Sequence, residues 1–496
     1  MDIEKRMRTG AFYTPKIWVD LSHKYLEDTL GSDWQEHYYI WDCAAGAGNL
    51  LEGLKNPKNV WASTLEFEDV ETMKERSELN LINDHVFQFD FLNDSFDKLP
   101  KELFEIISNE DKRKKLIVYI NPPYAEATNG LRFKTKPKNG VSNRHNTCVK
   151  YKGLLKGASN ELFSQFLIRI YMEINGCLIA EFSKLKILLG LNYVNFRQVF
   201  KAKLLKLFLV PSNTFYNVKG EFPIGFFIFD TSKKEYFTKI DADVYDNFGN
   251  SLPTKVIYNL DGKKFINNWI KSAPTDANNV GYLRIDANTK CRQRLIHITA
   301  KKSYAHVKFL EIGEKNLIDV SIYYSTAHCF TVTWLNECDL KMYPNVDYKN
   351  DPEFQSNCLA FTLFKNDISS KHIINHWIPF TEAEVNAQGK FESNFMTDFI
   401  ETNHIQFSKE AQAVLNAGRE IWKYYHSQSD INVNASFYDI KEYFQGRNES
   451  GIMNKSSKDT HYNKLLTELK VSLNVLKELI NKKGYEYGFF NDYEDR

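Results

Sequence analysis

Four consecutive residues, Asn121-Pro122-Pro123-Tyr124, directly follow the apolar run Leu116–Ile120. Two prolines in a row hold the backbone extended, so the Asn121 side-chain oxygen and the Pro122 carbonyl are expected to converge as two hydrogen-bond acceptors. A planar amine has two hydrogens to offer such a pair. Accepting both would free the nitrogen lone pair to attack an electrophile, while the Tyr124 ring would form a wall for a flat substrate. All four residues are therefore candidate catalytic residues.

A second candidate is the small-residue segment Asp42–Asn49, which follows the apolar run Tyr38–Trp41. Ala44, Gly46 and Gly48 would let a cofactor approach the backbone at the carboxyl edge of a sheet. Taken alone, such a segment is as often a tight strand-to-helix turn as a cofactor-binding loop.

Two further apolar runs also end in acids: Glu66 follows Val60–Leu65, and Asp90 follows Val86–Phe89. Glu66 could accept hydrogen bonds from ribose hydroxyls. Asp90 could accept an adenine amino hydrogen, and the adjacent Phe91 could stack on the base. Helix N-caps would explain each acid singly. Three acids at the ends of three successive expected strands favour a nucleotide-like cofactor site.

The elements that must position these residues follow from the pattern of apolar runs. Short runs alternate with helical patterns through the first half of the chain, which predicts an α/β fold with a Rossmann-like, mostly parallel, seven-stranded sheet. The expected strands are 38–41, 60–65, 86–89, 116–120, 177–182, 204–210 and 224–229. Thr14-Pro15 is expected to begin a helix, with the hydroxyl as cap and the proline at the first position.

The texture of the sequence changes twice, which predicts three parts. Residues 1–240 form the catalytic domain, including a basic loop at 125–157. Residues 241–400 form a mixed α+β domain, and residues 401–496 form a mainly helical region, because apolar residues recur there at helical spacing.

Charge and cysteine content bound the possible partners. The 496 residues contain 64 Lys and Arg and 63 Asp and Glu, so the formal net charge of +1 does not by itself indicate a nucleic-acid partner. Local charge does indicate one, because between Ala125 and Gly157 the only acid is Glu126, against these basic residues: Arg132, Lys134, Lys136, Lys138, Arg144, Lys150, Lys152 and Lys156. Seven cysteines without a Cys-x-x-Cys pair, a signal peptide or a membrane-length apolar run predict reduced thiols in a cytoplasmic protein, with no metal site and no membrane partner.

Three motifs in one order make the sequence resemble a known family. They are Thr9-Gly-Ala-Phe-Tyr-Thr-Pro15, Asp42–Asn49 and Asn121–Tyr124. The chain resembles the gamma class of adenine-specific (N6) DNA methyltransferases of restriction-modification systems, in particular the methylase and target-recognition parts of IIG-like enzymes without the nuclease domain. The resemblance implies S-adenosylmethionine as cofactor, double-stranded DNA as partner and target recognition by residues 241–400. Residues 401–496 would contact DNA or be structural. Cys43 departs from the family's usual proline.

The resemblance also assigns roles to residues. The expected cofactor contacts are Tyr13, Thr14, Pro15, Asp42, Ala44, Gly46, Gly48, Asn49, Glu66, Asp90, Phe91 and Asn121. An adenine flipped out of the duplex would stack on Tyr124 and on Phe215, with Phe222 as the second choice. The DNA contacts are expected from basic residue type and not from the resemblance: Arg132, Lys134, Lys136, Lys138, Arg144, Lys290, Arg292 and Arg294.

Different substrates for the same chemistry stay open. Cytosine-N4 methylation uses a similar exocyclic amine, although enzymes of that type more often have serine or aspartate at the position of Asn121. Methylation of an RNA guanine or a protein glutamine uses the same four-residue motif, in enzymes that are typically shorter. C5-cytosine methylation has no candidate thiol, because no Pro-Cys dipeptide occurs.

Two more hypotheses concern DNA specificity and cleavage. A DNA-specificity protein with a vestigial methylase half would be expected to have lost a motif, and none is lost here. A bifunctional restriction enzyme would have a nuclease domain ahead of Thr9, where only eight residues precede. A separately encoded restriction endonuclease is a further candidate partner.

The basic loop makes a testable prediction. Replacing Lys134, Lys136 and Lys138 together by glutamine is expected to weaken DNA binding and to flatten its salt dependence. The slope of log K against log salt should become less negative by about 0.9 for each phosphate that the variant no longer neutralises. Binding titrations at several salt concentrations measure this slope, and an unchanged slope in the triple variant would contradict the assignment.

Overall fold

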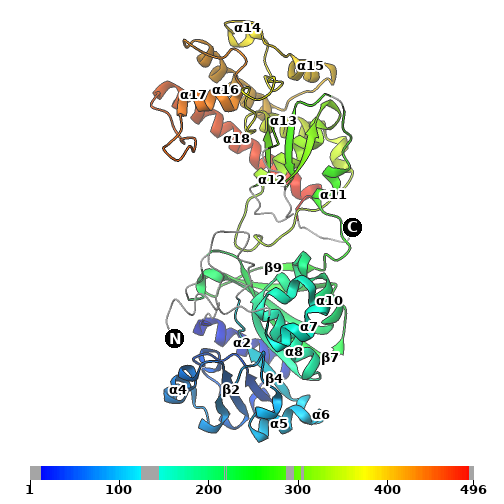
Figure 1. Cartoon of the computed structure of the whole chain (residues 1–496), viewed down its shortest axis with the longest axis vertical. Helices are drawn as coiled ribbons and strands as arrows, with labels where there is room; N and C mark the ends of the chain where they lie inside the picture. The colour runs from blue at the N-terminus through cyan, green and yellow to red at the C-terminus, as the bar shows by residue number, and fades with distance from the viewer. Residues whose placement is uncertain are drawn as a thin grey trace. The chain divides into compact units, whose positions relative to one another are not determined.

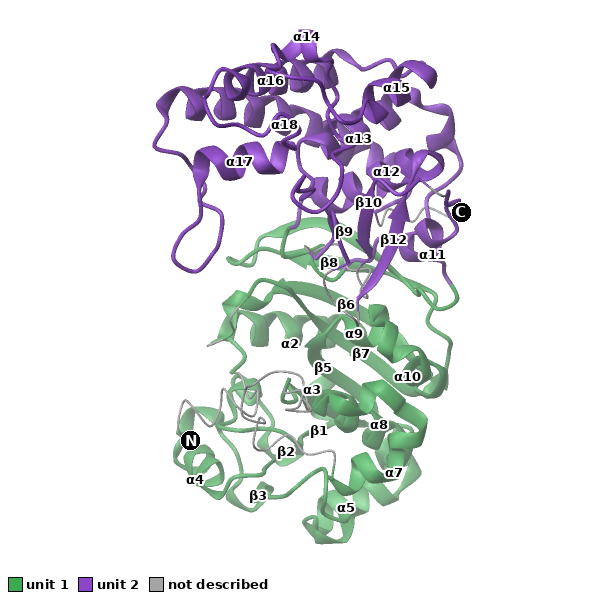
Figure 2. Ribbon diagram, turned by 45° about the horizontal axis from the view of Figure 1, so that its top comes forward, with its two compact units in different colours: residues 1–262, 333–338 green, residues 263–332, 339–496 purple. Residues whose placement is uncertain are grey.

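The computed structural model describes residues 13–124, 144–216, 218, 220–276, 278–285, 295–302 and 307–490. The chain forms two compact units (Figure 2): unit 1 is Met1–Gly262 with Thr333–Cys338, and unit 2 is Lys263–Val332 with Asp339–Arg496. The segment Thr333–Cys338 returns to unit 1, where the Leu335 carbonyl accepts a hydrogen bond from Lys255 Nζ at 2.8 Å. Among the described residues, no helix combines the length and apolar character needed to span a membrane.

Unit 1 is built on a nine-stranded sheet with the order β3-β2-β1-β4-β5-β7-β6-β8-β9. Its strands are β1 (Tyr39–Asp42), β2 (Val60–Thr64), β3 (Val86–Gln88), β4 (Leu116–Ile120), β5 (Leu178–Lys184), β6 (Ala202–Pro211), β7 (Pro223–Lys234), β8 (Lys239–Tyr245) and β9 (Ser251–Tyr258). The pairs among β1 to β5 are parallel, as is β6 with β8. Strand β7 runs antiparallel to β5 and β6, and β9 to β8.

These strands confirm the expected α/β fold with a large, mostly parallel sheet. All seven expected strands form, with ends that differ by a few residues at most, except that β7 continues to Lys234. Strands β8 and β9 extend the same sheet, so unit 1 continues beyond residue 240 to Gly262. The division into three functional domains stays a prediction.

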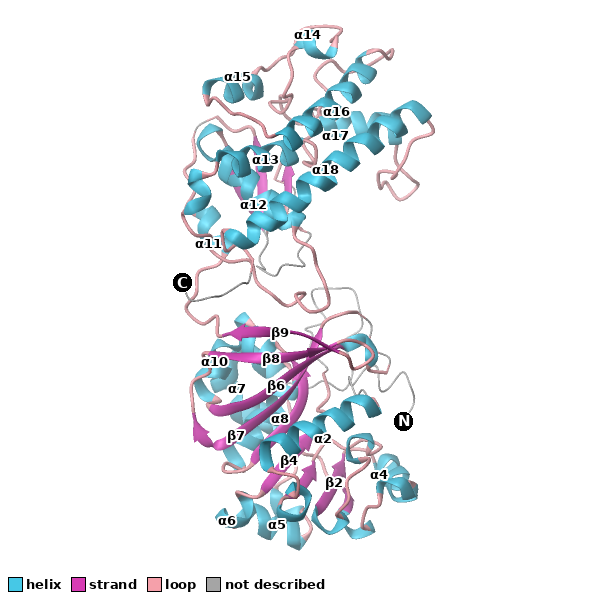
Figure 3. Ribbon diagram, turned by 180° about the vertical axis from the view of Figure 1, so that it is seen from behind, coloured by secondary structure: helices cyan, strands magenta, loops and turns pink. Residues whose placement is uncertain are grey.

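Helices lie on both faces of this sheet. In unit 1 they are α2 (Lys16–Leu30), α3 (Trp34–His37), α4 (Phe67–Glu75), α5 (Lys101–Ser108), α6 (Glu110–Arg113), α7 (Asn146–Leu155), α8 (Leu162–Glu173), α9 (Lys186–Leu189) and α10 (Val194–Val199). Helix α2 lies over one face and α7 and α8 over the other, as the opposite views of Figures 1 and 3 show. Ser22 Oγ of α2 lies 2.6 Å from Tyr119 Oη of β4. On the other side, Phe91 stacks on Phe166 of α8, with centroids 5.0 Å apart.

The central strand β4 is buried along its whole length. Parallel strands covered on both faces are expected to be continuous apolar runs, and Leu116–Ile120 is one. Its residues Ile117 and Val118 each have a parallel partner on both β1 and β5. The position of Asn121, the first residue after this strand, therefore follows from the sheet.

The start of α2 differs from the expectation. The helix begins at Lys16, Pro15 is its N-cap residue, and the structure shows no side-chain cap there. The Thr14 hydroxyl instead accepts a hydrogen bond from Asn121 Nδ2 at 2.9 Å. Thr14 therefore connects the N-terminal motif to the residue after β4 and does not cap the helix.

Unit 2 packs helices against a small antiparallel sheet of order β11-β10-β12. Its strands are β10 (Gly281–Ile285), β11 (His297–Thr299) and β12 (Lys308–Ile312), and its helices are α11 (Ile266–Lys271), α12 (Leu317–Cys329), α13 (Pro352–Leu363), α14 (Glu382–Val385), α15 (Phe395–Thr402), α16 (Lys409–His426), α17 (Phe437–Gln445) and α18 (Thr460–Glu486). Helices α16 and α18 form where the apolar spacing predicts them. They share one hydrophobic core with α12 and α13.

A glycine allows close packing inside this core. Gly418 lies within α16, where glycine normally costs about 1 kcal/mol relative to alanine. A Cβ atom at Gly418 would lie 2.0 Å from Cε1 of Phe364, whose ring also packs against Trp422 and Phe437. The missing side chain therefore makes room for the Phe364 ring.

We expect Gly418→Ala to destabilise unit 2 by roughly 1–3 kcal/mol, because overpacking outweighs the gain in helix propensity. Scanning calorimetry should show a lower Tm. Gly153→Ala is a matched control, since Gly153 lies within α7 and no atom in the described part of the chain would lie within 4 Å of a Cβ there. This control should be neutral or slightly stabilising, and an equal effect of the two substitutions would contradict the packing explanation.

Candidate functional site

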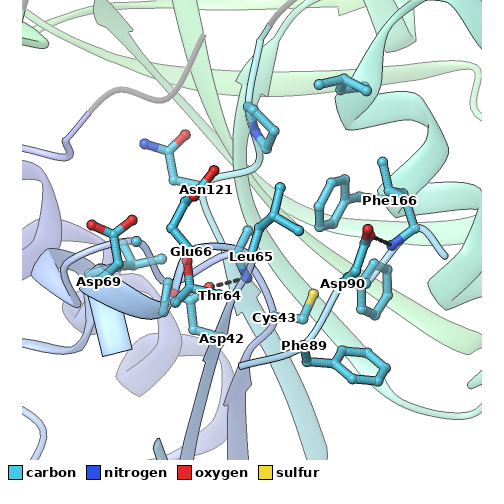
Figure 4. A pocket seen from close by; sticks show the side chains of 18 of the residues that line it. Asp42, Cys43, Thr64, Leu65, Glu66, Asp69, Phe89, Asp90, Asn121 and Phe166 are labelled. Atoms are coloured by element: carbon cyan, nitrogen blue, oxygen red, sulfur yellow. Dashed lines mark hydrogen bonds between the residues drawn. The ribbon is translucent and has the colours of Figure 1, made fainter. Parts of the chain in front are cut away.

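The carboxyl ends of β1, β2, β3 and β4 meet at one pocket, which Figure 4 shows from close by. Parallel strands end at the same edge of a sheet, so residues far apart in the sequence converge there. The lining residues are Tyr13, Thr14, Asp42, Cys43, Ala44, Ala45, Gly46, Asn49, Leu50, Thr64, Leu65, Glu66, Asp69, Phe89, Asp90, Phe91, Leu92, Asn121, Pro123, His145, Leu162 and Phe166.

The loop after β1 forms one wall of this pocket. Asp42 accepts a hydrogen bond from the Ala44 amide at 2.9 Å, and the Ala45 amide donates to the Ser63 carbonyl of β2 at 3.0 Å. Gly46 has a φ of +54°, and a Cβ there would meet none of the described residues within 4 Å. Its open side therefore leaves room for a ligand against the backbone.

Gly48 has a different role from Gly46. Its φ is +82°, and a Cβ would lie 2.6 Å from Cδ1 of Leu79. The residue therefore permits a left-handed turn and close packing of the loop, and it does not line the pocket. Arg76 holds the same loop from outside, because its guanidinium donates to the Ala47 carbonyl at 2.8 Å and to Asn49 Oδ1 at 2.7 Å.

The pocket is acidic. Asp42, Glu66, Asp69 and Asp90 line it, whereas no lysine or arginine does so within the part of the chain that the structure describes. Burial raises the pKa of Asp42 to about 7. A positively charged ligand would favour the ionised carboxylates, and a polyphosphate would be repelled.

Asn121 lies at the edge of the pocket with its amide held at both ends. Nδ2 donates to Thr14 Oγ1 at 2.9 Å, and Oδ1 accepts from Tyr124 Oη at 2.7 Å. An amide oxygen has two lone pairs and can accept two hydrogen bonds in all. The asparagine is therefore oriented before any substrate binds.

Tyr124 is buried, with 4% of its surface exposed. Its hydroxyl lies within hydrogen-bond distance of both Asn121 Oδ1 and the Phe182 carbonyl, the latter at 3.1 Å. Burial, together with the nearby Glu181 carboxylate, raises the pKa of Tyr124 well above its usual value, so the hydroxyl stays a donor. Phe215 is also buried, 6.0 Å from the Phe182 ring by centroids.

Most of the predicted cofactor residues come together at the pocket. Those that line it are Tyr13, Thr14, Asp42, Ala44, Gly46, Asn49, Glu66, Asp90, Phe91 and Asn121, whereas Pro15 and Gly48 do not. Of the catalytic motif, Asn121 and Pro123 line the pocket, and Pro122 and Tyr124 are buried beside it. The roles of all these residues stay predictions.

The predicted DNA contacts are largely outside the described residues. Arg132, Lys134, Lys136, Lys138, Lys290, Arg292 and Arg294 belong to segments that the structure does not describe. Arg144 is described and exposed, but the expected loop at 125–157 is not a loop throughout, because Asn146–Leu155 forms helix α7. Phe222, the second choice for base stacking, is half-buried and packs against the core of unit 1.

Several residues of the site escaped the sequence analysis. Asp69 and Thr64 lie close to predicted residues, but neither ends an apolar run. His145 and Phe166 reach the pocket from segments far along the chain. Phe166 is part of an ordinary apolar helix, and Arg76 is one of many basic residues, so no pattern singled them out.

No family model and no curated protein matches this sequence. Solved structures show a limited likeness. The methyltransferase subunit of a type I restriction-modification system from Streptococcus thermophilus is 16% identical over 47% of this chain and 46% of its own, with a TM-score of 0.34. The type IIG restriction endonuclease BpuSI is 21% identical over 49% of this chain and 28% of its own, with a TM-score of 0.33.

The structure of the DrdV–DNA complex is 14% identical over 49% of this chain and 28% of its own, with a TM-score of 0.35. In each of these three cases the chain covers less than half of the matched protein. A likeness of this degree does not determine the function of this chain, which we therefore infer from its own geometry.

The raised pKa values of two buried carboxyl groups lead to a prediction of how the free energy of unfolding depends on pH. Burial raises the pKa of Asp42 to about 7 and that of Glu181 of β5 to about 8. At these two positions the folded chain therefore binds more protons than the unfolded chain between about pH 4 and 8. The two protonated carboxyl groups make their full contribution to the free energy of unfolding at pH values below their pKa values in the unfolded chain. This contribution is lost as the pH rises through 7 and 8. The loss for Glu181 is on the order of a few kcal/mol.

Glu181→Gln should reduce this loss, because glutamine stays neutral and can still accept the Ser183 hydroxyl bond, 2.9 Å in the native chain. Urea unfolding at pH 5, 6, 7 and 8 measures the free energy of unfolding. Glu71→Gln, at an exposed position of α4, controls for the substitution itself. Parallel pH profiles of the native chain and Glu181→Gln would contradict the assignment.

Proposed function

We propose that this chain is an S-adenosylmethionine-dependent DNA methyltransferase that transfers a methyl group to the N6 amine of adenine in double-stranded DNA. The observation that most supports the proposal is the oriented Asn121 amide at the carboxyl end of β4, beside an acidic pocket at the same sheet edge. The pocket suits the cofactor, and the turn suits the amine.

The pocket residues fit S-adenosylmethionine by charge and shape. This cofactor has a sulfonium, an ammonium and one carboxylate group, so its net charge is positive, and four carboxyl groups of the chain line the pocket. Gly46 leaves room for it against the loop. We assign Glu66 to the ribose hydroxyls, Asp90 and Phe91 to the adenine, and Tyr13, Thr14 and Asp42 to the methionine end. When bound, the cofactor supplies an electrophilic methyl group.

The residues of the turn act on the substrate amine. Asn121 Oδ1 and the Pro122 carbonyl accept hydrogen bonds from the two N–H groups of the amine. These bonds direct the nitrogen lone pair toward the methyl group. Thr14 keeps the asparagine from rotating throughout, and Tyr124 adds to this until its ring turns outward to the base. Catalysis in this proposal is positioning for an in-line displacement, and no covalent bond to the enzyme forms.

Base stacking requires that both the target base and an aromatic side chain of this chain move. An adenine within a duplex must be flipped out to reach Asn121. Tyr124 and Phe215 are both buried in this structure, so either ring must turn outward to stack on the base. We assign the stacking platform to Tyr124 because it directly follows the acceptor pair.

Two features outside the Asn121–Tyr124 turn favour DNA over the other amine substrates. The segment between Ala125 and Gly157 has eight basic residues and one acid, which suits a phosphate backbone. Unit 2 has its own hydrophobic core and is large enough to recognise a target sequence. Cytosine-N4, RNA guanine and protein glutamine are the competing substrates, and the methylated product distinguishes them. A restriction endonuclease as partner is part of the proposal.

The proposal predicts a specific modification and its loss. DNA from cells that express the chain should contain N6-methyladenine in one short sequence, detectable by single-molecule sequencing. Asn121→Ala should lower the methylation rate at least about 100-fold, because the amine loses an acceptor and its orientation. Asn213→Ala, at an exposed position of unit 1, is the control and should leave the rate unchanged.

Three results would contradict the proposal. N4-methylcytosine in place of N6-methyladenine would assign the enzyme to cytosine. Methylation of RNA or protein but not DNA would identify RNA guanine or protein glutamine as the substrate. An Asn121→Ala variant as active as the native chain would exclude the assigned role of this residue.

A further inference from the structure

A lysine outside the predicted motifs contacts the catalytic turn. Lys184 is the last residue of β5, next to β4 in the sheet. Its Nζ donates a hydrogen bond to the Tyr124 carbonyl at 3.2 Å and lies 5.8 Å from the centroid of the Tyr124 ring. The side chain thus reaches from the end of one strand to the turn that follows its neighbour.

A buried carboxylate holds this lysine in place. Glu161 is the N-cap residue of α8, and 4% of its side chain is exposed. Its Oε2 lies 3.8 Å from Lys184 Nζ, and its Oε1 pairs with Lys186. Lys186 already pairs with Oε1, whereas Oε2 is buried without a hydrogen bond among the described residues, so a cation beside Oε2 is favoured and Lys184 supplies it.

The same contacts connect two parts of the site. Leu162, the residue after Glu161, lines the pocket, whereas Tyr124 ends the turn that orients the amine. Glu161 and Lys184 therefore join the wall of the pocket to the catalytic turn. Glu161 also offsets the charge of Lys184, which would otherwise disfavour a cationic ligand nearby.

The turn needs support of this kind because of its composition. Pro122 and Pro123 have no amide hydrogen, so the backbone of the turn cannot be fixed by donating from these positions. It can be held through its carbonyls and through the Asn121 and Tyr124 side chains. Lys184 provides a donor to one of these carbonyls, at the end of the turn opposite Thr14.

We propose that Lys184, held by Glu161, is a positioning residue that fixes the Tyr124 end of the Asn121–Tyr124 turn for methyl transfer. This inference rests on the proposed function. Lys184 touches the turn and not the reacting atoms. Its removal should therefore lower kcat more than it changes the affinity for S-adenosylmethionine.

The first test is steady-state methylation of DNA by variants of the full chain. Lys184→Met should lower kcat about 10- to 100-fold, because displacement of the turn misaligns the amine. The KM for S-adenosylmethionine should stay within about 2-fold of the native value. Lys184→Arg keeps a donor and should restore most of kcat. Glu161→Gln should lower kcat in the same direction as Lys184→Met, by a smaller factor.

Lys186→Met is the matched control. It removes the same kind of charge from the same carboxylate but leaves the bond between Lys184 and the Tyr124 carbonyl. Its kcat should stay close to the native value. If Lys186→Met and Lys184→Met lower kcat equally, or if Lys184→Met raises the KM for the cofactor as strongly as it lowers kcat, the positioning role is wrong.

A second readout does not need catalysis. Hydrogen exchange at the Asn121 and Tyr124 amides should be faster in Lys184→Met than in both the native chain and Lys186→Met, whereas exchange within β4 should not change. Equal exchange in all three proteins would overturn the inference. A native chain that methylates no DNA, together with this exchange pattern in the variants, would contradict the proposed function and still show that Lys184 fixes the turn.

Discussion

Hydrogen bonding of strand β4 to both β1 and β5 is the constraint on which the site depends. Helices cover the sheet on both faces, so the strand can satisfy its backbone groups only through these neighbours. The register of the three strands then determines where Asn121 and the ends of β1 and β5 lie. Because β1, β2 and β3 are also parallel, their last residues arrive at the same edge. The pocket is a consequence of strand direction.

Burial of charge is the second physical feature of unit 1. Asp42, Glu161 and Glu181 are all buried carboxylates. The three carboxylates have different partners. Asp42 accepts a hydrogen bond from a backbone amide, and Glu161 pairs with two lysines. Among the described residues, Glu181 accepts a hydrogen bond only from the Ser183 hydroxyl. Burial without a cation raises the pKa of Asp42 and Glu181. Charge that is costly to bury is concentrated near the turn and the pocket, where a cationic ligand would offset part of the cost.

Two glycines in the loop after β1 have different roles, because one leaves room for a ligand and the other permits close packing. Gly46 and Gly48 are two residues apart and both have a positive φ. A side chain at Gly46 would enter open space in the pocket, whereas one at Gly48 would collide with Leu79. Gly418 of unit 2 is like Gly48 in this respect, because the Phe364 ring occupies the space where its side chain would lie. A glycine in the sequence therefore does not by itself indicate a ligand.

The sequence by itself determined the seven strands of the α/β sheet and the order of the acids at their ends, because apolar runs and the residues that follow them are local patterns. It also predicted a cofactor loop at Asp42–Asn49 and an acceptor turn at Asn121–Tyr124, whose chemistry lies in residue types and spacing. Only the tertiary structure decided that β8 and β9 join the sheet, since edge pairing depends on the neighbouring strand. It also placed Thr14 on Asn121, Asp69 and Phe166 in the pocket, and Lys184 on Tyr124. These contacts join residues up to 107 positions apart, and no local pattern records which distant side chain will fill a given space.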